Sequence, residues 1–105
     1  MYETRREAAA ACTYEAKAAE HYSKVAIEYA RRGECRKAWS AADTARIAAK
    51  CAMQAHEALW SLSGGELTEA EFTAFEAAEI AQTNAAKAER AAAKAVDQIM
   101  REARN

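Results

Sequence analysis

Two histidines and three cysteines are the residues of this chain whose types could perform chemistry. They are Cys12, His21, Cys35, Cys51 and His56. Metal ligands usually recur at short intervals, as in C-x-x-C or H-x-x-x-H, and metal centres in helical bundles use Glu-x-x-His pairs. The sequence contains none of these intervals, so we expect no metal and no other cofactor. The odd number of cysteines argues against a disulfide framework and favours a reducing, cytoplasmic location.

Nucleophilic catalysis would need one of these cysteines beside a base. Cys51 and His56 are five positions apart, and in a helix that interval places two side chains on different faces. The paired glycines Gly64 and Gly65 lack the further glycine and the lysine of a phosphate-binding loop. We therefore expect that the protein is not an enzyme.

The elements that hold these residues are predicted to be helices. Alanine supplies 31 of the 105 residues, proline is absent, and glycine occurs three times. This composition favours helix throughout, with breaks at Gly33 and at Gly64-Gly65. The predicted helices cover about residues 3–32, 34–62 and 67–104. Thr68 and Glu71 have the spacing of a capping box at the start of the third helix.

The third helix contains a seam of small residues at the spacing of a coiled coil. Intervals of four and three alternate through Ala74, Ala78, Ala81, Ala85, Ala88, Ala92, Ala95 and Ile99. Alanine buries little area, so the seam stabilises only if other helices come unusually close. Short connections between helices require antiparallel neighbours. We predict a single domain over residues 1–105, an all-α, up-down-up three-helix bundle with long, closely packed, coiled-coil-like helices.

Because alanine contributes little apolar area, we expect a monomer to depend on its larger side chains for a core. These are Tyr14, Tyr22, Tyr29, Trp39, Trp60, Phe72 and Phe75, with a few aliphatic residues. Self-association is a natural way to bury additional surface.

The third helix is predicted to be longer than the other two. About 38 residues give roughly 57 Å, against roughly 43 Å for each of the others. The segment after Ala95 would then extend beyond the bundle, and it contains Val96, Ile99 and Met100. These three residues are a candidate partner interface. Two alternatives are that the first or second helix leans to cover the segment, or that the end frays.

Residues 19–51 resemble a single tetratricopeptide helical hairpin, with Gly33 as the turn glycine. The positions that match the pattern of that family are Tyr22, Val25, Ala26, Tyr29, Ala38 and Ala45. Ala42 stands where the family has an aromatic residue, no proline closes the unit, and no second copy follows. The resemblance implies a groove that binds a peptide or a helix.

Charge is separated along the predicted bundle although the net charge is only −1. The sequence from Cys51 to Ala86 contains no lysine or arginine but several glutamates, which places an acidic end at the second connection. The opposite end gathers a candidate patch for an anion or a partner: Arg31, Arg32, Arg36, Lys37, Arg90 and Lys94. Such a patch suits an acidic or phosphate-bearing partner, or the acidic end of another copy.

These features favour a small non-enzymatic module for protein–protein interaction or self-assembly, with a homo-oligomer or a protein partner. The alternatives are a binder of nucleic acid or a phosphate ligand through Arg31, Arg32, Arg36 and Lys37, and a small phage or mobile-element inhibitor of another protein. We expect no membrane partner, because no run approaches 18 apolar residues. The biological process does not follow from the sequence.

Overall fold

The helix boundaries follow from residues suited to those places. In the computed structural model, which describes residues 2–104, α1 spans Arg5–Arg31, α2 spans Cys35–Ser63 and α3 spans Glu69–Arg104. These bounds lie within two residues of the predicted ranges. Gly33 has φ +76° in the first turn, and Gly64 has φ +64° directly after α2. Both values lie in the left-handed region, where glycine is the least strained residue.

The first and third helices each begin at a threonine cap. The backbone N–H of Glu7 donates to Oγ1 of Thr4 over 3.1 Å. At α3 the backbone N–H of Glu71 donates to Thr68 Oγ1 over 3.2 Å, and the Thr68 N–H donates to Glu71 Oε1 over 2.9 Å. This reciprocal pair is the predicted capping box. Thr68 is therefore the cap and α3 starts at Glu69, two residues later than predicted.

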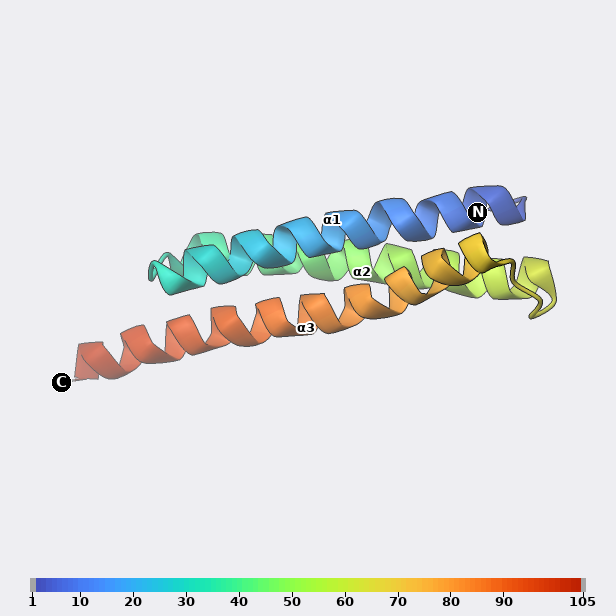
Figure 1. Cartoon of the computed structure of the whole chain (residues 1–105). Helices are drawn as coiled ribbons and strands as arrows, with labels where there is room; N and C mark the ends of the chain where they lie inside the picture. The colour runs from blue at the N-terminus through green and yellow to red at the C-terminus, as the bar shows by residue number, and fades with distance from the viewer. Residues whose placement is uncertain (1, 105) are drawn as a thin grey trace.

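All three helices pack against one another, which confirms an all-α three-helix bundle. The molecule is a rod with extents of 58 × 19 × 16 Å. Figure 1 shows α2 running back beside α1 and α3 returning along both, so the order is up-down-up. The N-terminal end of α1 and the α2–α3 connection share one end of the rod, and the α1–α2 turn lies towards the other end.

The core is built almost entirely of alanine. The buried hydrophobic residues of the described chain are alanines from all three helices, together with Cys12 and Leu59. On α1 the buried residues form one row of small side chains: Ala8, Cys12, Ala16, Ala19, Ser23 and Ala26. On α3 the seam from Ala74 to Ala95 is buried as its spacing predicts. Small side chains at the contact positions let the helices pack closely, without need of larger core residues.

The prediction that the large aromatic residues form the core is wrong. Tyr14 is 71% exposed, Trp60 is 52%, Phe72 is 50% and Trp39 is 43%. Tyr22 is also exposed, whereas Tyr29 and Phe75 are half-buried. The physical reason is the alanine packing itself, because closely packed helices leave no interior volume for an indole or phenyl ring. The rings therefore lie at the flanks and outer faces of the helices.

The bundle ends before α3 does. Ala95 is the last buried residue of α3, Val96 is half-buried, and residues 97–104 are all exposed while still helical. Figure 1 shows this end of α3 running past the α1–α2 turn. Neither α1 nor α2 leans over to cover it. We call residues Val96–Arg104 the tail.

Candidate functional site

The cysteines and histidines are not grouped for metal binding or nucleophilic chemistry. Over residues 2–104 no three His, Cys, Asp or Glu side chains are placed to hold a metal ion together. Cys12 is buried, and burial raises the pKa of its thiol to about 11. Its Sγ lies 4.0 Å from the carbonyl oxygen of Ala52, a weak contact of a protonated thiol. Cys35 and Cys51 are half-buried and free.

The structure instead brings together an aromatic cluster between α2 and α3. The ring of His56 stacks on that of Phe75, with centroids 3.5 Å apart and planes inclined by 21°. The centroid of the Trp60 ring lies 5.6 Å from that of Phe75, with the planes inclined by 36°. His56 and Trp60 are one helical turn apart on α2, so both reach the same stretch of α3.

One nitrogen of this cluster lacks a hydrogen-bond partner. The side chain of His56 is only 14% exposed, and its Nε2 is buried with no partner among the described residues. The nearest carboxylate oxygen, Oε2 of Glu79, is 3.6 Å away, which is too long for a hydrogen bond. An ion pair forms there only when the imidazole is protonated.

The exposed edge of the cluster is an open groove. Its lining residues are His56, Glu57, Trp60 and Phe75, and its volume is about 480 Å³. Trp60 packs closely against Gly65, where an added Cβ would lie 3.2 Å from the indole Cζ2. We call Glu57, Trp60, Phe75 and Glu79, with the ring of His56 between them, the acidic aromatic surface.

An ion pair between α1 and α3 lies at the same end of the rod as the aromatic cluster. Arg5 donates from Nε to Glu71 Oε2 over 2.9 Å and from Nη2 to Glu71 Oε1 over 2.5 Å. The same Nη2 donates to the carbonyl oxygen of Glu66 over 2.7 Å. The Arg5 guanidinium, and then the N–H of Thr68, lower the pKa of the Glu71 carboxyl to about 2. This link orders the acidic end without covering Trp60 or Phe75.

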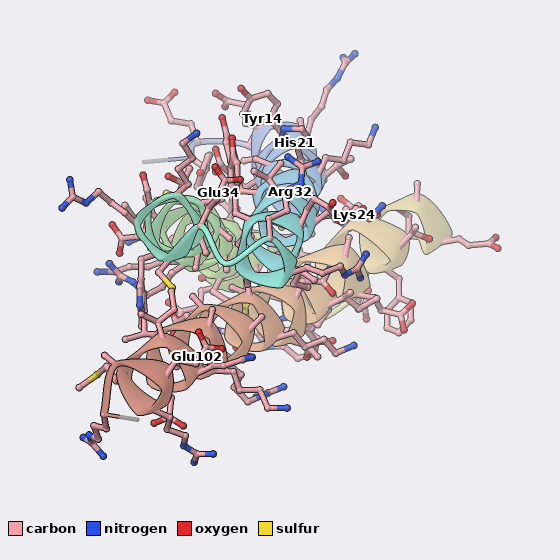
Figure 2. The ribbon with its side chains drawn as sticks, turned by 90° about the vertical axis from the view of Figure 1, so that its left-hand side faces the viewer. Tyr14, His21, Lys24, Arg32, Glu34 and Glu102 are labelled. Atoms are coloured by element: carbon pink, nitrogen blue, oxygen red, sulfur yellow. The ribbon has the colours of Figure 1, made fainter. Side chains whose placement is uncertain are left out.

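At the opposite end the tail exposes the residues predicted as a partner interface. Ile99 is 45% exposed and Met100 is 51%, while Val96 at the base of the tail is half-buried. Asp97 and Arg101 form an ion pair of 3.0 Å on the same helix. Figure 2 looks at this end of the rod and shows the tail, with Glu102 labelled, projecting away from the α1–α2 turn at Arg32 and Glu34.

The predicted basic patch is partly neutralised by neighbouring carboxylates. Arg31 and Arg32 both pair with Glu28, at 3.4 Å and 3.3 Å. Lys37 pairs with Glu34 at 3.3 Å, and its Nζ lies 5.6 Å from the centroid of the Tyr29 ring.

The other three basic residues of the patch are Arg36, Arg90 and Lys94. None of these three forms an ion pair with any residue in the part of the chain that the structure covers. Arg36 lies in the first turn of α2, which has no acidic residue and no side-chain cap. A cation there opposes the helix dipole, so its charge is not explained by helix stability.

Comparison of the chain with protein-family models, curated proteins and solved structures finds no match. Among the described helices, none combines the length and the apolar character needed to cross a membrane. Sequence reasoning found the tail but missed the acidic aromatic surface, because it assigned Trp60 and Phe75 to the core. The sequence did contain a signal for this surface. His56 and Trp60 lie just before the α2–α3 connection and Phe75 lies just after it, within an acidic stretch of the chain.

Proposed function

We propose that the protein is a non-enzymatic helical module that assembles with further copies of itself through its exposed apolar side chains. The observation that supports this most directly is the inverted distribution of side-chain size. Alanine fills the interior, while Trp60, Phe72, Ile99 and Met100 are about half exposed. Large apolar side chains are the ones that contribute most to association when they leave water.

The free energy of burying large apolar side chains favours association over a solitary monomer. Fully burying a side chain such as Ile99 or Phe72 contributes about 1.5–3 kcal/mol, whereas an alanine methyl contributes far less. In a monomer most of the large apolar side chains stay in contact with water, and the largest fully buried side chains are Leu59 and Cys12. Contact between copies would recover part of this free energy.

Light scattering on the purified protein tests this proposal. The tail variant, Ile99→Asp with Met100→Asp, places two carboxylates on the exposed apolar side chains of the tail. We expect the wild type to scatter as a species heavier than the 11.5 kDa chain and the tail variant to lose that extra mass. Tyr14→Ala is the matched control, because Tyr14 lies on α1, outside the tail and the acidic aromatic surface, and its removal should leave the mass unchanged. Equal masses for the wild type and the tail variant would count against the proposal.

A second candidate function is binding of a phosphate-bearing partner at the basic end. Arg36, Arg90 and Lys94 favour it, because no carboxylate neutralises them within residues 2–104. Binding of a short single-stranded oligonucleotide should then weaken steeply with salt, since phosphate contacts release counterions. Arg36→Glu with Lys37→Glu should abolish it, and salt-independent binding would contradict it.

A further inference from the structure

We propose that the tail of one copy docks into the acidic aromatic surface of the next, so that the copies associate head to tail. This inference rests on the proposed self-assembly and specifies its geometry. The occupant of the groove is a second copy of this chain, through residues Val96–Arg104.

The tail has the side-chain pattern of a helix that binds in a groove. Its apolar residues follow the intervals i, i+3, i+4 and i+7, through Val96, Ile99, Met100 and Ala103. This pattern aligns anchors along one face, as in amphipathic helices that bind apolar grooves. The segment is already helical to Arg104, so binding pays little for ordering it.

The acidic aromatic surface provides an apolar groove that suits the apolar residues of the tail. Trp60 is 52% exposed, and with Phe75 and His56 it lines the groove of about 480 Å³. The groove is open to solvent, so side chains of the size of Ile99 and Met100 can lie against its rings. Aromatic rings supply large contact area at low cost in conformational entropy, and such residues dominate binding hot spots. Phe72, about one turn before Phe75 on α3, is also half exposed.

Charge complementarity selects this pairing. Glu57 lines the groove and Glu79 lies beside its His56 ring, in a stretch from Cys51 to Ala86 that contains no lysine or arginine. The opposite end of the chain, residues 90–104, carries Arg90, Lys94, Arg101 and Arg104 against Asp97 and Glu102, a net side-chain charge of +2. Opposite charges around an apolar centre fix the orientation of binding. Tail-to-tail pairing would instead bring the basic turn ends of two copies together, which costs free energy.

The tail cannot reach the groove of its own chain. Phe75 and Ile99 lie on the same helix, 24 positions apart, which is roughly 36 Å at about 1.5 Å per residue. An unbroken helix keeps them apart, so only a second copy can fill the groove. Two antiparallel copies that exchange tails would close as a two-fold dimer, whereas a contact that is not reciprocated extends into chains or rings.

Mixing two complementary variants tests the direction of assembly. The tail variant (Ile99→Asp, Met100→Asp) has an intact groove, and a head variant (Trp60→Ala, Glu79→Lys) has an intact tail. Each alone is expected to be a monomer of 11.5 kDa. An equimolar mixture contains one functional tail and one functional groove, so it should form a 1:1 heterodimer and nothing larger. Helical circular dichroism checks that each variant is folded.

Each other result of this mixing experiment overturns the inference. A head variant that assembles like the wild type, with a mixture no heavier than expected from its components, would indicate tail-to-tail pairing. A mixture that stays monomeric while the wild type assembles would refute head-to-tail contact but leave self-assembly intact. A wild type that stays at 11.5 kDa would refute self-assembly itself. A charge-only head variant, Glu57→Lys with Glu79→Lys, guards against a loss of folding and should also be rescued by the tail variant.

Discussion

Enlarging one alanine of the α3 seam should destabilise the bundle although it adds apolar surface. Ala88 is fully buried in a cluster with Ala26, Ala38, Ala42 and Ala92. Leucine at this position adds three carbons where alanines of α1 and α2 already make contact. The helices must separate or the side chain must leave its preferred rotamer, and overpacking of this kind costs about 1–3 kcal/mol. Moving the helices apart would also weaken the packing of the neighbouring alanines.

Urea unfolding followed by circular dichroism measures this change in the free energy of unfolding for Ala88→Leu. The matched control is Ala86→Leu, two positions away on the same helix but exposed, and it should stay within about 0.5 kcal/mol of the wild type. All proteins are compared at one low concentration, because association adds to apparent stability. A gain in stability for Ala88→Leu would refute the reasoning, since it would mean that the interior contains unfilled space.

Three further predictions follow from single residues. Leu59→Ala should cost about 2–5 kcal/mol in urea unfolding, because Leu59 is the largest fully buried side chain; a loss under 1 kcal/mol would contradict its role. The pKa of Glu71, about 2, lies below the ordinary value of 4.5. The Arg5–Glu71 ion pair therefore stabilises the fold fully above pH 4.5, and this stabilisation is lost as the pH falls towards 2. Glu71→Gln should remove that dependence, measured by acid unfolding, and an unchanged acid profile would contradict it. At pH 8 a thiol reagent should modify Cys35 and Cys51 before Cys12, because the buried Cys12 thiol has a pKa of about 11 and stays protonated. Mass spectrometry follows the order of modification, and earlier modification of Cys12 would contradict this prediction.

The helices and their order could be predicted because local signals agree with one another. Gly33 and Gly64 mark the breaks, Thr68 and Glu71 mark the third start, and the long alanine runs have strong helix propensity. The extension of α3 beyond the turn also followed from helix lengths alone. Each of these signals depends on residues close together in the chain.

The choice of buried row could not be made from the sequence. On α1 the row with Ala16 and Ala19 and the row with Tyr22 and Val25 both have helical spacing, and hydrophobicity favours the larger row. The structure buries the small row because three helices share one narrow interior, and their mutual distance is a tertiary property. Placement of Trp60 and Phe75 on the surface depends on the same distance. That is why the acidic aromatic surface became visible only in the structure.

Large apolar side chains lie outside the monomer, and in the proposed assembly they are covered by a second copy. Acrylamide quenching of tryptophan fluorescence tests both points directly, because Trp39 is 43% and Trp60 is 52% exposed. We predict strong quenching at the lowest protein concentration and progressively weaker quenching as the concentration rises. Weak quenching in the dilute protein would contradict the surface placement of the two indoles. Strong quenching of Trp60 at every concentration would contradict its coverage by a second copy.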